Sequence, residues 1–174
     1  GAYSVGLNQI IDYVGGKTFG AFNWGDTRFV ILDCGEDKPD STWVYYGLNN
    51  FDELRNSQLT FLEAERKNKA FKKAEKRVLI HHIPLHGLKP NRYAPCTELW
   101  SEVLNKSNLS VAINGHTHRF AYHKAGSLGN NYPVVIGGGY KENDATVMVL
   151  SKINKTLELK VVAIDGSVSG EYKF

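Results

Sequence analysis

Two short apolar runs joined by a helix-forming segment constrain the fold of this chain more than any other feature. Residues 78–80, Val-Leu-Ile, and residues 109–113, Leu-Ser-Val-Ala-Ile, have the apolar character of strands that are buried in a sheet. Between them, residues 96–107 carry apolar side chains at helical spacing. A connection of this length that contains a helix joins parallel strands, almost always by a right-handed crossover. We therefore expect a βαβ unit within an α/β fold.

The rest of the chain reads as further strands and one more helix. A hairpin is expected from residues 20–24 and 28–33, around the turn at 25–26. Residues 42–46 are expected to form a short strand, and a helix capped by Asn56 or Ser57 is expected to run to residue 76. The later strands are expected at 119–124, 133–137, 145–151 and 156–164, the last two as a meander. A length of 174 residues fits one domain, so residues 1–174 are read as a single domain.

Charge and hydropathy exclude several classes of partner. A net charge of +3 is too small to indicate binding of nucleic acid or of an anionic membrane. The basic run at 65–77 is read as a solvated helix surface, because glutamates are interspersed in it. No apolar run has the length that a bilayer span needs, so a soluble protein is expected. The N-terminal ten residues have no signal-peptide pattern, although an upstream signal that was removed stays open, and the compartment is not predicted.

Histidines follow both strands of the predicted βαβ unit. His81 and His82 come directly after the first strand, and His116 and His118 come shortly after the second. Parallel strands end at the same edge of a sheet, where ligands bind in open α/β folds. We therefore expect both clusters to share one metal or phosphate site, since neutral imidazole suits zinc, iron and manganese. Gly115 is expected to let the backbone turn there at an angle that other residues resist.

The remaining candidates for chemistry are read as structural. Cys34 and Cys96 are interpreted as buried thiols, and their pairing in an oxidising compartment is left open. A Cys–His hydrolase centred on Cys96 is disfavoured, because no orienting Asn or Asp can be identified. His123 falls within a predicted strand and is interpreted as a structural residue.

The two histidine motifs carry a family resemblance. "HHIPLHG" at 81–87 and "NGHTH" at 114–118 resemble the last two metal-binding motifs of the calcineurin-like metallophosphoesterases, which include the purple acid phosphatases. "FNWGDTRFVILDCG" at 22–35 and "NSQLTFLEAE" at 56–65 resemble the strand pair and helix that precede those motifs. The resemblance implies a two-sheet sandwich flanked by helices, in which a mixed sheet contains the βαβ unit.

The resemblance also implies roles for individual residues. His82, two residues before Pro84, would bind a metal ion together with His116, and His118 would bind a second ion. The implied reaction is hydrolysis of a phosphate ester at two Zn, Mn or Fe ions. No catalytic residue is assigned within this chain. Three further residues are candidates for contact with substrate or for support of the ligands: His81, His86 and Asn114. For His86, exposure to solvent is the open alternative.

The first three motifs of the family, D-x-H, G-D-x-x-D and G-N-H-E/D, are absent. The chain therefore resembles only the C-terminal half of the catalytic domain. Two dications about 4 Å apart repel by on the order of 16 kcal/mol at an effective dielectric of about 20. Three neutral imidazoles cannot offset this repulsion. We expect the intact protein to hold two metal ions, and this chain alone to hold none or one weakly bound ion.

Half of a sandwich would leave an apolar sheet edge and face exposed. The expected partners are therefore the missing N-terminal half of the domain or a self-association partner, besides a phosphate-ester substrate. Two functions stay open. The chain either belongs to a phosphoesterase whose N-terminal half lies elsewhere, or is a non-catalytic module that binds a metal ion or a partner.

Overall fold

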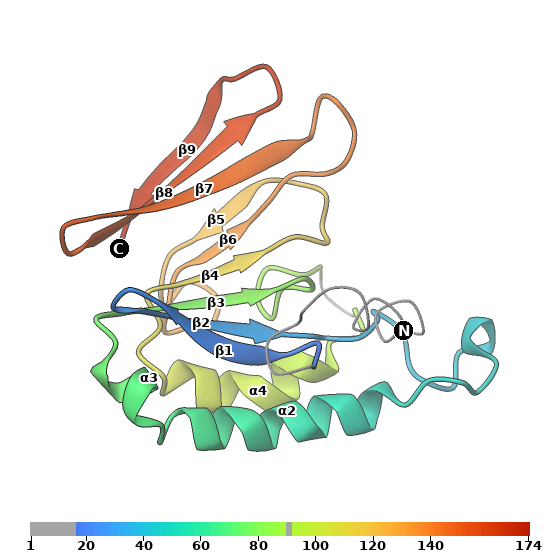
Figure 1. Cartoon of the computed structure of the whole chain (residues 1–174). Helices are drawn as coiled ribbons and strands as arrows, with labels where there is room; N and C mark the ends of the chain where they lie inside the picture. Colours follow the sequence, from blue (N-terminus) through green and yellow to red (C-terminus); the bar gives the residue numbers. More distant parts are fainter. Residues whose placement is uncertain (1–16, 90–91) are drawn as a thin grey trace.

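The computed structural model describes residues 17–89 and 92–174. Within these ranges the chain forms two β-sheets and a layer of helices (Figure 1). The prediction made for the N-terminal ten residues lies outside the described residues. Among the helices that the structure describes, none combines the length and apolarity needed to cross a bilayer.

The larger sheet is mixed and contains the predicted βαβ unit. Its strand order is β1-β2-β3-β4-β6-β5. The strands are β1 (Gly20–Trp24), β2 (Thr27–Leu32), β3 (Lys76–His81), β4 (Val111–Asn114), β5 (Ala121–His123) and β6 (Val134–Ile136). The four central strands run parallel, while β1 and β5 pair antiparallel at the two edges. The parallel pairing of β3 with β4 confirms the topology predicted from the two apolar runs.

The smaller sheet is an antiparallel meander of three strands. It consists of β7 (Thr146–Ile153), β8 (Thr156–Ala163) and β9 (Val168–Lys173). The predicted meander is confirmed for β7 and β8, with Asn154 of the turn in the left-handed region at φ 54°. Strand β9 was not predicted, because four of its six residues are exposed and only Gly170 and Tyr172 are partly buried. That alternation is too weak to mark a strand.

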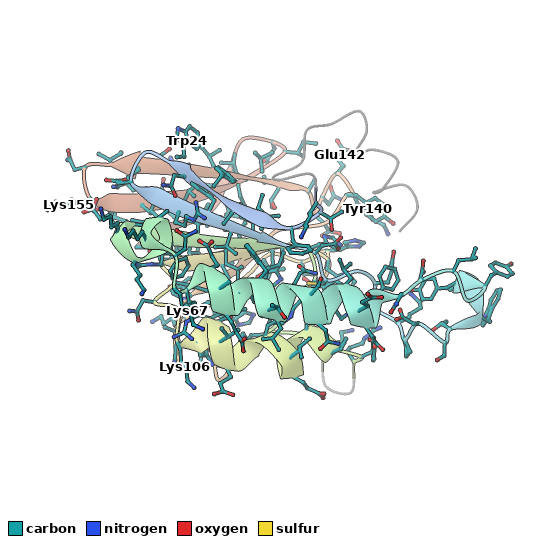
Figure 2. The ribbon with its side chains drawn as sticks, turned by 60° about the horizontal axis from the view of Figure 1, so that its bottom comes forward. Trp24, Lys67, Lys106, Tyr140, Glu142 and Lys155 are labelled. Atoms are coloured by element: carbon teal, nitrogen blue, oxygen red, sulfur yellow. The ribbon has the colours of Figure 1, made fainter. Side chains whose placement is uncertain are left out.

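Helices α2 (Phe51–Glu65) and α4 (Pro95–Asn105) pack side by side on one face of the larger sheet, and Figure 2 shows them from that side. The predicted start of the first helix was wrong. Asn50 caps it, because its side chain accepts from the Glu53 N–H at 3.2 Å and donates to the Glu53 carboxylate at 2.6 Å. The prediction also merged α2 with a separate short helix, α3 (Lys69–Lys73).

The strand predicted at 42–46 is instead a 3₁₀ turn, η2 (Trp43–Tyr45). Tyr46 closes it in the left-handed conformation at φ 51°. The side chains of Trp43 and Tyr46 are 76% and 78% exposed, so this segment contacts no sheet that could hold it extended. Its aromatic and β-branched composition favoured a strand, but propensity without a neighbouring strand does not form one.

Two apolar cores hold the layers together. Leu79 faces the core between the larger sheet and the helices, where Trp100 of α4 is completely buried. Val78, on the other side of the same strand, faces the core between the two sheets, opposite Leu157 and Leu159 of β8. The consecutive apolar residues of β3 therefore serve two cores, as expected for a central parallel strand.

Candidate functional site

The two histidine clusters meet at the carboxyl edge of the larger sheet, as the topology predicted. The Gly115 N–H donates to the His82 carbonyl at 3.0 Å, which continues the contact of β3 and β4 past their ends. The rings of His82 and His116 then lie edge to face, with centroids 5.3 Å apart and planes at 88°. The ring of His118 packs in the same manner against Tyr140, at 5.1 Å. Figure 2 shows Tyr140 at the end of the molecule opposite to Lys155, which lies in the β7–β8 turn.

The surroundings of the His82 imidazole disfavour its charged form. Burial lowers the pKa of His82, and the nearby rings of His116 and His118 lower it further. A lowered pKa keeps the His82 imidazole neutral at pH 7, which is the form that binds metal ions.

The backbone of the second cluster is unusual at the histidines themselves. His116 has φ 70° and His118 has φ 57°, both in the left-handed region that residues with a Cβ rarely adopt. The expectation that Gly115 supplies the unusual angle was wrong. Gly115 instead lies close to His82, because a Cβ there would be 3.3 Å from Nδ1 of His82 and would require the ring to shift slightly. The strain sits on the candidate ligands, a pattern that is common at functional sites.

A carboxylate that the sequence analysis did not single out lies next to His116. Oδ2 of Asp37 is 3.8 Å from Nε2 of His116. Lys38, whose ammonium contacts the other carboxylate oxygen at 2.6 Å, holds the pKa of Asp37 below its usual value. A signal for this residue was present. Asp37 follows β2, which runs parallel to β3, so its loop emerges at the same sheet edge.

A cavity of about 340 Å³ adjoins the histidines. The polar and aromatic groups that line it are Asp37, Lys89, Arg92, Tyr93, His116, Thr117 and His118. The two cations and the tyrosine come from the segment that connects β3 to α4. They were not predicted, because loop residues carry no periodicity that could place them in space.

Arg55 of α2 fixes two walls of this cavity. Its guanidinium is buried and donates to the carbonyls of Cys34 and Glu36 at 3.1 and 3.0 Å. The same group donates to the Tyr93 hydroxyl at 3.3 Å and lies over the Tyr93 ring. One side chain thus ties the loop that carries Asp37 to the loop that carries Tyr93.

The other candidates lie away from the cavity. Nδ1 of His81 is buried 2.8 Å from the Ile83 carbonyl, and burial lowers the pKa of His81 to about 4. Nδ1 of His86 is 3.1 Å from the Leu128 carbonyl. The Asn114 side chain donates to the His81 carbonyl at 2.9 Å and therefore braces β3 against β4. These contacts are internal, and none of the three residues lines the cavity beside His116.

The donor types at this edge suit a transition metal, but their arrangement is incomplete. Among residues 17–89 and 92–174, no group of three or more His, Cys, Asp or Glu side chains is placed to hold a metal ion. Two imidazoles and a carboxylate approach each other without converging on one point.

Comparison with known proteins identifies the fold. No protein-family model matches the chain, and the search of curated proteins found no match. Among solved structures, the purple acid phosphatase PPD1 from yellow lupin (Lupinus luteus) seeds matches with a TM-score of 0.59 at 16% identity. That match covers 91% of this chain and 32% of the phosphatase. GAP50, the anchor in the inner membrane complex of Plasmodium, matches with a TM-score of 0.51 at 16% identity, over 90% of this chain and 52% of GAP50.

The chain therefore shares the fold of the matched part of that purple acid phosphatase, in agreement with the fold that the histidine motifs implied. The chain spans about a third and about half of the length of these two proteins. At such identities the likeness establishes the fold and not the activity.

Proposed function

We propose that this chain supplies His82, His116 and His118 as ligands of a two-metal phosphoesterase site that is complete only in the intact protein. The observation that carries the proposal is the edge-to-face approach of His82 and His116, at 5.3 Å, where two parallel strands end. The metallophosphoesterase fold supports it, and so does the lowered pKa of His82. The intact protein would hydrolyse phosphate esters, and two Zn, Mn or Fe ions would supply the Lewis acidity for that reaction.

Residues of this chain would orient the ligands. Asp37 stays ionised beside Nε2 of His116 and favours a proton on that nitrogen, which leaves Nδ1 free as a donor atom. Lys89 and Arg92 add two cationic side chains to the lining of the cavity, which suits an anionic substrate. Arg55 holds Tyr93 and the Asp37 loop in place through its buried hydrogen bonds.

The test measures metal binding and hydrolysis separately. Calorimetric titration of the 174-residue chain with Zn²⁺ or Mn²⁺ should reveal no site or one weak site, and any such site should disappear in His116→Ala. In the intact protein, His116→Ala should lower hydrolysis of p-nitrophenyl phosphate by on the order of 100-fold or more, because even outer-shell partners of metal ligands contribute 10–100-fold. Ser127→Ala, at an exposed turn that does not line the cavity, is the control and should keep activity. Two tight sites on the chain alone would contradict the division of ligands.

A second candidate is a non-catalytic module that binds one metal ion or a partner through these histidines. The incomplete set of donors within the described residues favours it. An intact protein that binds metal through His116 but hydrolyses no phosphate ester would decide for this candidate.

A further inference from the structure

An open apolar cleft lies between the two sheets, away from the histidines. Its volume is about 850 Å³. The larger sheet contributes Phe29, Ile80 and Ile113 to its walls, and the smaller sheet contributes Met148, Leu150 and Leu157. At its rim, the side chain of Trp24 in the β1–β2 hairpin is 75% exposed (Figure 2).

The cleft exists because the three-stranded sheet is too narrow to cover the whole face of the six-stranded sheet. Strand β9 lies over β5, where the rings of Tyr172 and Tyr122 stack at 4.0 Å. The far end of β7 reaches the start of β2, where Lys152 binds Asp26. No described strand of the smaller sheet lies beyond β7 to cover β1 and the adjacent face of β2.

The uncovered face is a continuous apolar row across the parallel strands. Ile31, Ile80 and Ile113 are register partners on β2, β3 and β4, and all three are only partly buried. In the neighbouring row, by contrast, Val78 and Val111 are completely buried beneath β8. Parallel strands are normally covered on both faces, so this row lacks a layer.

Strand β7 offers the backbone to which that layer can attach. It has a strand neighbour, β8, on one side only among the described residues. Met148 and Leu150 turn toward the cleft, whereas Val147 and Val149 point outward and are 64% and 48% exposed. A strand of eight residues with this alternation, and with one edge free among the described residues, is a template for the addition of another strand.

Contacts at both ends hold β7 in position above the cleft. At its start, the Thr146 hydroxyl accepts from the Gly138 N–H at 2.7 Å. At its end, the ammonium of Lys152 donates to the carboxylates of Asp26 and Glu75. The edge is therefore fixed while the space beneath it stays open.

A second copy of this chain cannot fill the space by antiparallel pairing of the two β7 edges. Antiparallel pairing of two β7 strands requires a two-fold axis perpendicular to the sheet, which places both larger sheets on the same side of the joined strands. Each larger sheet already extends beyond β7 by β1 and part of β2, so the two would overlap. The occupant must bring a strand without a sheet of its own beneath it.

We propose that the β7 edge and the cleft dock a β-strand from the part of the metallophosphoesterase domain that this chain does not contain. The strand adds to β7, and its apolar residues, at every second position, cover the row formed by Ile31, Ile80 and Ile113. The two similar structures support this occupant, because this fold makes up only 32% and 52% of their chains. The identity of the partner rests on the proposed function, whereas the docking site rests on the cleft and the edge.

The test uses an eight-residue peptide with the sequence of β8, TLELKVVA, as the probe. In the chain, β8 pairs with β7 and directs Leu157, Leu159 and Val161 toward the larger sheet. Added to the 174-residue chain, the peptide should slow hydrogen exchange of the β7 amides and change the fluorescence of Trp24. A control peptide with Leu157→Ser, Leu159→Ser and Val161→Ser should do neither.

Two matched variants locate the site. Leu150→Arg, in the cleft, should weaken peptide binding at least tenfold, whereas Val149→Arg, on the outer face of the same strand, should leave it unchanged. Circular dichroism checks that both variants are folded. Binding that is unaffected by Leu150→Arg, or equally weakened by both variants, would overturn the docking site. A defined dimer whose formation protects the β7 amides in the absence of peptide would instead make the occupant a second copy.

The intact protein separates this inference from the proposed function. Its β7 amides should already be protected, and the peptide should not bind. If they exchange freely in an intact protein whose hydrolysis depends on His116, the docking site is wrong and the proposed function stands. If the β7 amides are protected in an intact protein that neither binds metal nor hydrolyses phosphate esters, the docking site stands and the proposed function is wrong.

Discussion

The backbone conformation of two histidines is the most informative feature at the scale of single residues. His116 and His118 adopt the left-handed region, which costs a residue with a Cβ about 1–2 kcal/mol. No turn of ordinary composition would place two such residues within three positions. Both residues line the same cavity, and the rest of the fold must offset the cost of their conformation.

Glycine should relieve this strain. We expect His116→Gly to be more stable to urea than His116→Ala by about 1 kcal/mol, because glycine adopts φ 70° without penalty. His82, which is not in the left-handed region, is the control. There the order should reverse, with His82→Ala more stable than His82→Gly. Equal stabilities of the two variants at position 116 would contradict the assigned conformation.

Acid should destabilise the fold through His81. Its pKa is about 4 in the folded chain, because burial disfavours the charged form, against 6.5 when unfolded. The unfolded chain therefore binds a proton between pH 6.5 and 4 that the folded chain does not, so the free energy of unfolding falls as the pH drops through this window. The loss is about 1.4 kcal/mol per pH unit and about 3 kcal/mol in all. Urea denaturation from pH 7 to 4 should show a shallower loss for His81→Gln than for the natural chain.

The sequence predicted that the two histidine clusters meet at one sheet edge, but it did not predict which other side chains surround them. Apolar runs and helical spacing predict parallel strands, and topology then brings His82 and His116 together without knowledge of any loop. Asp37, Tyr93 and Arg55 depend on loop paths and on a contact between segments 38 residues apart. Neither composition nor periodicity encodes such contacts.

At the scale of elements, sequence patterns predicted the strands and helices that pack against a neighbouring element. The β1–β2 hairpin and the β3–α4–β4 unit were predicted, because each buries the apolar face that its sequence shows. The predictions failed at η2, which packs against no sheet, and at β9, which contributes only the side chain of Tyr172 to a core. Local propensity and tertiary packing favour the same structure in the hairpin and the βαβ unit, whereas they favour different structures at η2 and β9.

A buried ion pair joins β2 to α2 and should be sensitive to loss of one partner. Arg28 donates to both carboxylate oxygens of Glu65, at 2.7 and 3.0 Å, and both side chains are at least 90% buried. Glu65→Gln should lower the free energy of unfolding by about 3 kcal/mol, because it leaves the guanidinium uncompensated. The double variant Arg28→Met/Glu65→Leu should recover most of that loss. Thermal unfolding measures both, and a double variant no better than the single one would count against a charge effect.

At the scale of the whole molecule, the chain folds two cores but leaves one face unfinished. The helices cover one side of the larger sheet completely, whereas the smaller sheet covers only part of the other. This asymmetry corresponds to a fold that makes up a third to a half of the proteins it resembles.

The unfinished face should make the isolated chain self-associate at micromolar concentration, because large exposed apolar patches are adhesive. Since two β7 edges cannot pair, we expect open-ended growth with concentration and no defined dimer. Light scattering over a concentration series measures this, and Leu150→Arg should reduce it. A concentration-independent monomer would contradict the expectation.

The two anchored ends of β7 also affect how fast the cleft can be filled. Since the receiving edge is already ordered, only the incoming strand loses conformational freedom on docking. A strand on a separate polypeptide would then bind at a rate proportional to its concentration, whereas one on the same polypeptide would bind at a fixed rate set by linker length. A mixture of two separate parts should therefore gain activity after a lag that shortens on concentration, and a continuous chain should show no such dependence.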